Sequence, residues 1–485
     1  MQNNSVTKQV FWFSLISYLG VAIGIVSTLF IYPENPELLG IIRTIESYSQ
    51  IIFPIILIGA SQALVHFYPT LSVENKNRLF LYSIYSVLVN SVLVVGAILL
   101  FSILFNFDFI QWIWIALPLG ISIALNEVFK RQSLNLQKIA LPSLFEKIIP
   151  KVVLPLIFVL VGMHFIPEKK GVWYFVFSYV LILLFTGIYT LKQDKTQWDS
   201  RFKKVFQNIS KKEYFRYSLY AFTGSLGSLL AFRIDTLMLG YLGYSMEEVG
   251  IYNLGVMIAM TLIIPATGIF AINSPVISEL VKEDKIKELK VKYTENAKLL
   301  FAIGALLYSC VFLGINDLFS LLPAKENLMQ SISILLILGL GVVINVGTGF
   351  NSEIITFSKH YRFNVIAILV MIILNIGLNL FFVLVLQTGM IGVAYSSFIS
   401  ISAFNLLKTI YIQKKFGILP FDKKYLQLFA VIVVVGIVVY FLPNLSSNFW
   451  NLIVKSGLCL TLNFVFIYKL KLIYQVNKLN IFKKF

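Results

Sequence analysis

Fourteen apolar stretches, each long enough to cross a lipid bilayer, occupy most of this 485-residue chain. They lie at about 10–32, 39–66, 80–105, 109–128, 145–165, 171–191, 215–242, 247–273, 297–316, 328–351, 363–386, 389–411, 425–442 and 448–468. Only 13% of the residues are charged, about half the share of an average soluble protein. Backbone polar groups inside a bilayer are satisfied by helices. We therefore expect an all-α polytopic membrane protein with about 14 transmembrane helices.

Little of the chain remains outside these stretches, which argues against an enzyme. The longest outer loops, near 164–171 and 317–327, hold about ten residues each. The sequence has no Gly-rich phosphate loop, nucleophile elbow or HExxH motif. Its two cysteines are far apart and its three histidines show no ligand spacing, so neither a metal nor another cofactor is expected.

Basic residues are concentrated on one side of the membrane. When the loops alternate sides from the N-terminus onward, 34 of the 40 Lys and Arg residues fall on the side that holds both termini. The positive-inside rule places that side in the cytoplasm. This bias accounts for the net charge of +17 through the anionic inner leaflet, without a nucleic-acid partner.

The chain resembles itself at an offset of six helices. The segment from Glu37 to Pro54 matches that from Glu247 to Pro265, with Gly40 aligned on Gly250. Six helices is an even number, so the two copies enter the membrane from the same side as parallel repeats around a central cavity. We expect a six-helix lobe at 1–192, a cytoplasmic linker at 193–214, a second lobe at 215–412, and two extra helices with a basic tail at 413–485.

Three segments carry a recognisable pattern: ILIGASQALVHFYP, RIDTLMLGYLG at 233–243, and LNIGLNLFFVLVLQTGMIGVAYSSFIS at 374–400. They resemble segments of a known family, the polysaccharide (O-antigen and capsule repeat-unit) flippases of the multidrug/oligosaccharidyl-lipid/polysaccharide exporter superfamily. In the last segment Asn375, Asn379, Gly389 and Gly392 stand at the recurring positions, whereas Gln387-Thr388 replaces the proline that often precedes the first glycine.

The resemblance implies that the protein translocates an undecaprenyl-pyrophosphate-linked oligosaccharide from the inner to the outer leaflet by alternating access. It also implies a bacterial inner-membrane location, and a polysaccharide polymerase and chain-length regulator as partners besides membrane lipids. Coupling to a proton or sodium gradient stays open. The alternatives are a multidrug or peptidoglycan-precursor exporter of the same superfamily, and a membrane polysaccharide polymerase or glycosyltransferase.

Four charged side chains lie inside predicted spans, where an ionised group is costly unless it is paired or hydrated. Arg43 and Arg233 are expected to bind an anionic substrate, because guanidinium groups match phosphate oxygens. Glu46 and Asp235 are expected to exchange the coupling ion. The alternative for each is an ion pair that only neutralises charge.

Helical periodicity places a polar stripe on the second span and polar residues on other spans. Arg43, Glu46, Ser47, Gln50, Pro54 and Ser61 fall within about 60° of one direction, which predicts a cavity-facing surface. Asn253 and Asn345, with Asn351, are expected to bind sugar hydroxyls. Their alternative role is an interhelical hydrogen bond.

Overall fold

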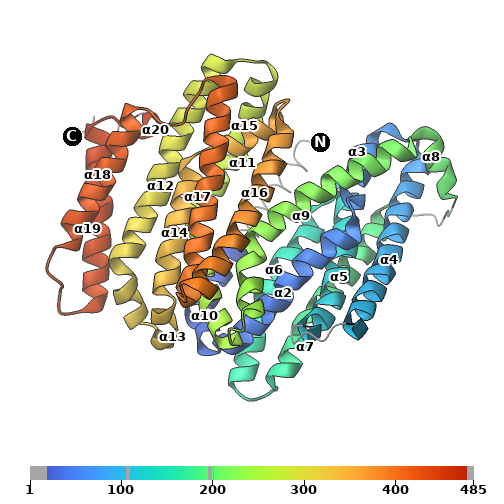
Figure 1. The fold of residues 1–485 in the computed structure, drawn as a ribbon, viewed down its shortest axis with the longest axis horizontal. Coiled ribbons are helices and arrows are strands. Elements are labelled where there is room, and N and C mark those ends of the chain that lie inside the picture. The colour runs from blue at the N-terminus through green and yellow to red at the C-terminus, as the bar shows by residue number, and fades with distance from the viewer. Residues whose placement is uncertain (1–18, 105–109, 195–198, 200, 478–485) are drawn as a thin grey trace. The chain divides into compact units, whose positions relative to one another are not determined.

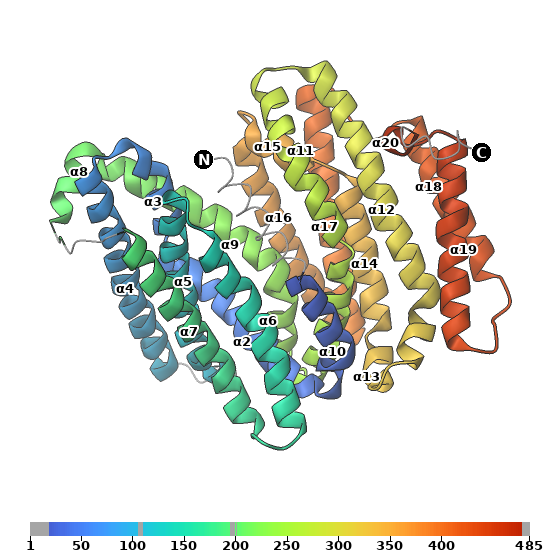
Figure 2. The ribbon, with the colours of Figure 1, turned by 180° about the vertical axis from the view of Figure 1, so that it is seen from behind.

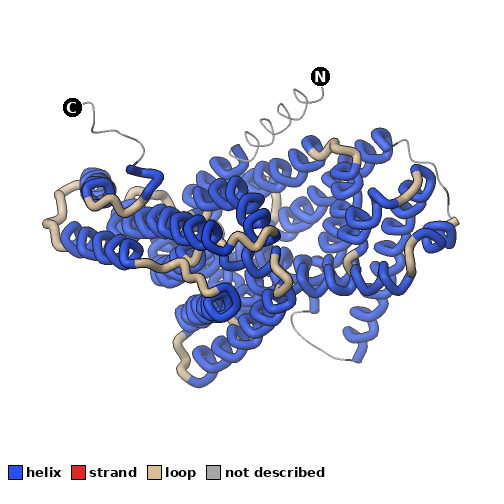
Figure 3. The backbone as a smooth tube through the Cα atoms, turned by 90° about the horizontal axis from the view of Figure 1, so that it is seen from above, coloured by secondary structure: helices blue, strands red, loops and turns tan. Residues whose placement is uncertain are grey.

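The structure is a computed structural model that describes residues 19–104, 110–194, 199 and 201–477. These residues form helices joined by loops, with no strand among them (Figure 3). The chain divides into two compact units, residues 1–250 and 251–485. The prediction of an all-α polytopic membrane protein is confirmed.

Unit 1 is organised around α2, which packs against helices from distant parts of the sequence. An apolar helix at Leu19–Glu34 ends in the 3-10 turn η1 and leads into α2. The helices that follow are α2 (Pro36–Leu57), α3 (Ala60–Phe67), α4 (Val73–Leu104), α5 (Ile110–Asn135), α6 (Ala140–Gly162), α7 (Glu168–Asp194), α8 (Val205–Asn208) and α9 (Lys211–Tyr241). Helix α2 contacts α4, α5, α7 and α9, so neighbouring helices pack against its polar face as well as its apolar face (Figure 1).

A break separates α2 from α3. Pro54 lies inside α2 and cannot donate the helical hydrogen bond to the carbonyl of Gln50. Ile58 and Gly59 then adopt positive φ angles of 39° and 74°, and the axes of the two helices differ by 48°. A Cβ atom on Gly59 would lie 2.0 Å from the Ser218 carbonyl oxygen, so only glycine allows α9 to approach the break this closely.

Unit 2 contains the second set of helices, of which α12 lies between two groups (Figure 2). Helix α10 (Met246–Thr261) begins in unit 1 and ends in unit 2. It is followed by α11 (Ile264–Lys282), α12 (Ile286–Ser320), α13 (Lys325–Gln330), α14 (Ile332–Gly347), α15 (Asn351–Phe357), α16 (Tyr361–Leu380), the π-helical turn η4 (Phe381–Val385), α17 (Gly389–Phe416), α18 (Lys423–Tyr440), α19 (Asn448–Lys469) and α20 (Tyr474–Asn477). Helix α12 packs on α11 and α14 on one side and on α18 and α19 on the other.

In the described residues the fourteen apolar stretches fall on helices; positions 10–18, 105 and 109, at the ends of three of these stretches, lie outside the described residues. Within the described part of the chain, nine helices are long and apolar enough to span a membrane, or eleven when two bent helix pairs each count as one span. The chain is thus a multi-pass membrane protein. The lobe boundaries predicted from the repeat stay a prediction, because the two compact units follow contacts and assign α9 to unit 1.

The two aligned glycines of the repeat lie against each other inside unit 1. A Cβ atom on Gly40 would be 1.8 Å from the Met246 carbonyl oxygen, and one on Gly250 would be 1.7 Å from the Pro36 carbonyl oxygen. The first turns of α2 and α10 therefore cross backbone to backbone, at a distance that no side chain permits. The repeat seen in the sequence thus has a matching reciprocal contact in space.

Candidate functional site

Arg43 and Glu46 form an ion pair on the face of α2, three residues apart as the sequence predicts. Arg43 Nη1 donates to Glu46 Oε2 at 2.5 Å, and only 14% and 13% of the two side chains are exposed. Tyr32 and Tyr179 lie close enough to interact electrostatically with this pair. The pair is therefore held in a largely protein-lined environment, where electrostatic interactions are stronger than in water.

Arg233 of α9 reaches the same carboxylate. Its Nη1 lies 4.0 Å from Glu46 Oε2, and 31% of its side chain is exposed. We call Arg43, Glu46 and Arg233 the arginine cluster. Two guanidinium groups share one carboxylate, so the cluster carries one net positive charge inside a membrane-spanning unit and can attract an anion.

The other predicted site residues occupy separate environments. Asp235 is partly buried two residues after Arg233 on α9, and Asn253 of α10 is 3% exposed. Asn345 of α14 accepts a hydrogen bond from Asn405 of α17 at 3.1 Å, and Asn405 Oδ1 in turn accepts one from Asn351. Asn345 and Asn351 thus belong to an interhelical amide network, which is the alternative role that their residue type suggested.

Part of the polar stripe predicted on the second span is buried against neighbouring helices. Ser47 is 0% exposed and donates to the Arg43 carbonyl oxygen at 2.7 Å. Ser61, also 0% exposed, lies beyond the break in α3, where the helical direction has changed. Their predicted orientation toward a cavity is therefore wrong, because a hydroxyl that bonds within its own segment can be packed away from water.

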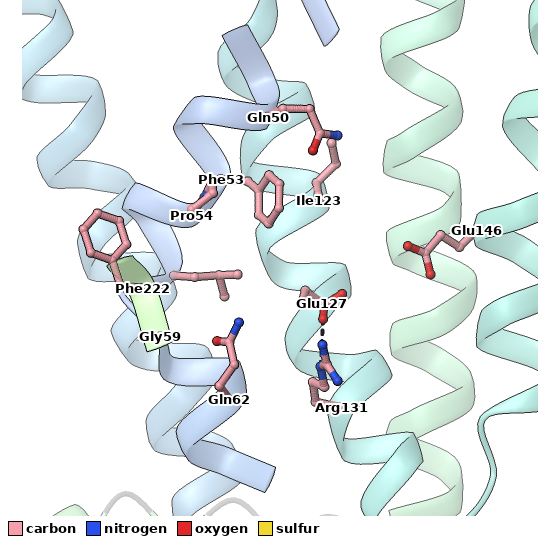
Figure 4. A pocket seen from close by; sticks show the side chains of 11 residues that line it. Gln50, Phe53, Pro54, Gly59, Gln62, Ile123, Glu127, Arg131, Glu146 and Phe222 are labelled. Atoms are coloured by element: carbon pink, nitrogen blue, oxygen red, sulfur yellow. Dashed lines mark hydrogen bonds and ion pairs between the residues drawn. The ribbon is translucent and has the colours of Figure 1, made fainter. Parts of the chain in front are cut away.

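A polar pocket of about 290 Å³ lies in unit 1 beside the break between α2 and α3 (Figure 4). We call it the amide pocket, because two glutamine side chains line it. Its lining residues are Gln50, Phe53, Pro54, Leu57, Gly59, Gln62, Ile123, Glu127, Arg131, Glu146 and Phe222. They come from α2, α3, α5, α6 and α9, so the pocket exists only when these helices pack together.

Ion pairs neutralise the charged wall of the amide pocket. Lys130 Nζ lies 2.6 Å from Glu127 Oε2 and 3.0 Å from Glu146 Oε2. Arg131 Nε donates to Glu127 Oε1 at 2.8 Å. Two cations and two carboxylates therefore form one connected network along α5 and α6.

The sequence did not predict this pocket, because Lys130 and Arg131 follow the predicted span at 109–128 and were expected in a loop. The available signal was the spacing of Glu127, Lys130 and Arg131, three and four residues apart at the end of a span. That spacing indicates a continued helix. Helix α5 indeed extends to Asn135, which brings the charges into the packed part of unit 1.

A second cavity, of about 760 Å³, lies in unit 2 between α12, α14 and α18. Aromatic and aliphatic side chains dominate its lining, among them Phe301, Tyr308, Phe312, Phe429 and Tyr440. Gly436 also lines it, and a Cβ atom there would meet nothing within 4 Å. Such a surface suits a hydrocarbon chain.

Comparison with known proteins finds a matching family model and similar solved structures. Residues 221–381 match the family model described as MatE. No curated protein matches the chain. The fold is similar to that of a lipid II flippase, MurJ, in an inward closed conformation, with a TM-score of 0.72, 16% identity, and coverage of 94% of this chain and 99% of that one.

Two further solved structures share the fold. A multidrug resistance MATE family transporter of the MOP superfamily, in an inward-facing conformation, matches with a TM-score of 0.62 and 15% identity over 83% of this chain and 94% of that one. A MOP superfamily transporter from Pyrococcus furiosus matches with a TM-score of 0.57 and 15% identity over 85% and 96%. These proteins are transporters rather than enzymes. The family model thus matches about a third of the chain, and the solved transporters show the fold that the chain shares with them.

Proposed function

We propose that this protein moves an undecaprenyl-pyrophosphate-linked oligosaccharide repeat unit from the inner to the outer leaflet of the bacterial inner membrane. Alternating access exposes the substrate first to one side and then to the other, and the product serves the synthesis of a surface polysaccharide such as O-antigen, capsule or lipopolysaccharide. Both termini are cytoplasmic in this proposal. A polymerase and a chain-length regulator would then use the translocated unit.

The arginine cluster is the observation that carries the proposal. A diphosphate brings negative charge that must cross a low-dielectric region, which is costly without a compensating cation. Arg43 and Arg233 supply two guanidinium groups against the single carboxylate of Glu46. Arrival of the diphosphate gives each guanidinium an oxyanion partner, and Glu46 then becomes available to take up a coupling ion, as Asp235 also would.

The apolar cavity of unit 2 supports a lipid-linked substrate. A long isoprenoid chain needs an apolar surface when its headgroup leaves the membrane plane. The cavity between α12, α14 and α18 offers such a surface and is large enough, at about 760 Å³, to hold part of that chain. A water-soluble drug would gain less from binding to this apolar cavity.

The test follows lipid-linked repeat units, leaflet by leaflet, in cells that lack the protein and are rescued with variants. We expect the units to accumulate on the cytoplasmic face without the protein, and wild type to clear them. Arg233→Gln should lower the clearance rate about ten-fold to a hundred-fold, since a charge-assisted hydrogen bond contributes about 1.5–3 kcal/mol. Arg43→Ala and Asp235→Ala should also impair clearance.

Arg216→Gln is the matched control, because Arg216 lies on α9 like Arg233 but is exposed. This variant should clear the units as wild type does. Units that reach the outer face normally without the protein and stay unpolymerised would exclude the proposal and favour the polymerase alternative.

A second candidate is the flipping of a peptidoglycan precursor. The similar lipid II flippase covers 94% of this chain, compared with 83% for the MATE transporter, so its likeness extends over more of the chain. A strain whose own lipid II flippase can be shut off distinguishes the two candidates. Growth rescued by this protein would favour the precursor, and lysis despite normal expression would favour the oligosaccharide.

A further inference from the structure

The geometry points to the amide pocket as a binding site for one neutral sugar ring of the lipid-linked saccharide. This inference rests on the proposed function and deepens it, because it assigns the saccharide and the diphosphate to different residues. The arginine cluster would hold the diphosphate. The amide pocket would bind the sugar ring.

The balance of charges around the amide pocket argues against a phosphate or a coupling cation as its ligand. Glu127 and Glu146, which line the pocket, are matched by Arg131 of the lining and by Lys130 behind it. A phosphate needs a net positive site, and a coupling cation needs a carboxylate that is not already paired with a cation. A neutral polar ligand fits an electroneutral wall, because it exchanges hydrogen bonds without adding charge.

Gln50 supplies unused hydrogen-bonding groups to the pocket. Its side-chain amide lines the pocket and has no hydrogen-bond partner among the described residues. Its backbone carbonyl also lacks the usual helical donor, because the residue four positions later is Pro54. One residue thus offers two donors and two acceptors, the mixed pattern that sugar hydroxyls require.

The charged residues of the pocket wall supply further hydrogen-bond donors and acceptors. Arg131, which lines the pocket, uses Nε to bind Glu127 (Figure 4), so its two terminal nitrogens remain as donors. The carboxylate oxygens of Glu127 and Glu146 can accept from hydroxyl groups in addition to Lys130, since each oxygen has two lone pairs.

Apart from Gln62, the remaining lining is apolar and includes two aromatic rings and a proline. Phe53 and Phe222 stand on one side of the pocket with Pro54 between them (Figure 4). Sugar rings present C–H groups on their faces, and such faces pack on aromatic and proline surfaces. The pocket volume of about 290 Å³ is at the lower limit of small-ligand sites, about 300 Å³, so it suits a single ring rather than an oligosaccharide.

The spacing along α2 relates the two sites. Gln50 follows Arg43 by seven residues, so the two lie on the same face of the helix about 10 Å apart. A sugar close to the diphosphate could therefore occupy the amide pocket while the diphosphate contacts the arginine cluster. Both sites lie in unit 1, so this arrangement depends on that unit alone.

The test measures binding of defined lipids to the purified full-length protein in nanodiscs. The probes are undecaprenyl diphosphate alone and the same lipid carrying one glucose, galactose or N-acetylglucosamine. Wild type should bind at least one of the glycosylated lipids about ten-fold more tightly than the bare lipid. Gln50→Leu should remove this preference and keep the affinity for the bare lipid.

Gln427→Leu serves as the matched control, because Gln427 is exposed on α18 in unit 2. It should keep the full preference. Should Gln50→Leu fail to fold, Gln50→Glu provides the same comparison with a side chain of nearly equal size.

The outcomes separate this inference from the proposed function. Equal binding of the bare lipid and all three glycosylated lipids by wild type overturns the sugar site and leaves the flippase proposal standing. A preference that survives Gln50→Leu and Gln50→Glu also overturns it. If wild type binds none of the four lipids, the proposed function itself fails.

Discussion

Lys408 is a buried cation near the end of the predicted span at 389–411. Its side chain is 1% exposed in α17, its Nζ donates to Ser352 Oγ at 2.6 Å, and it lies 3.6 Å from the centroid of the Phe404 ring. A buried charge of this kind is stable only while its few partners remain, because removing one leaves the desolvation cost uncompensated.

We expect Ser352→Ala to lower the free energy of unfolding by about 1–3 kcal/mol, because the ammonium loses its hydrogen-bond acceptor. Adding Lys408→Met to that variant should recover most of the loss, since an apolar side chain of similar length needs no partner. Thermal unfolding of the purified protein measures both effects. Equal midpoints for wild type and Ser352→Ala would show that water or another group replaces the serine.

Residue spacing offered an ion pair between Arg43 and Glu46 as the alternative to their separate roles, but it did not indicate what covers each face of the helix. The spacing of Arg43 and Glu46 was sufficient to place them together, and the structure adds Arg233 to them. Ser47 lies on nearly the same helical face and is nevertheless buried. The direction of a side chain follows from one helix, whereas its exposure depends on the neighbouring helices, which a single sequence does not specify.

At the scale of elements, the segment after α7 is attached to α4 by a buried arginine. Arg78 is 4% exposed, and its Nε donates to Asp199 Oδ2 at 2.8 Å. Tyr82, one turn further along α4, packs edge-on against Phe202 and Phe206. The described residues between α7 and α9, 199 and 201–210, are therefore held on the surface of unit 1.

The Asp199 carboxylate is the electrostatic part of this attachment. Hydrogen bonds from Arg201, and then from Arg78, hold the pKa of Asp199 well below its usual range. A lowered pKa in the folded state stabilises the contact above the unfolded value of about 4, and this stabilisation is lost as the pH falls through the folded pKa. The attachment is thus intact at neutral pH.

Asp199→Asn imitates the protonated form and should release the segment at neutral pH. We expect trypsin to cleave after Lys203 and Lys204 several-fold faster in this variant than in wild type, as followed by mass spectrometry. Glu74→Gln is the control, because Glu74 also contacts Arg78 but its side chain is 80% exposed and contributes little. Identical cleavage in Asp199→Asn and wild type would mean that the aromatic contacts alone hold the segment.

The crossing of α2 and α10 predicts a severe effect from a small substitution. Gly40→Ala or Gly250→Ala would place a methyl group less than 2 Å from a backbone carbonyl oxygen, so the helices must separate. We expect at least a several-fold loss of monodisperse protein in size-exclusion chromatography. Gly96→Ala on α4 should show wild-type yield, because a Cβ atom there meets nothing within 4 Å. Full yield from both repeat variants would rule out the close crossing.

At the scale of the whole molecule, the positions of the apolar helices were predictable and the contacts among them were not. In the described residues the predicted apolar stretches fall on helices, of which nine to eleven are long and apolar enough to span a membrane, because the bilayer imposes their length. The sequence predicted only some of the breaks between helices. Pro54 marked one of them, but the bend between α14 and α15 occurs at Thr348 and Gly349, where Gly349 has a φ of 66° and no proline is present.

Membrane orientation can be tested with single cysteines in a variant that lacks Cys310 and Cys459. We expect Lys170→Cys and Lys325→Cys to react with a membrane-impermeant maleimide in intact cells, because the positive-inside rule places them outside. Lys204→Cys and Lys414→Cys should react only after permeabilisation. The opposite pattern would invert the topology and reverse the direction of transport in the proposed function.

The reciprocal contact of Gly40 and Gly250 also bears on how the chain arose. Each glycine accommodates the backbone that carries the other, so neither position can accept a larger residue on its own. In a symmetric dimer of six-helix chains, one glycine codon would serve both places around the twofold axis. If such a chain were duplicated and fused, two separate codons would have to keep glycine, while the sequences around them could diverge.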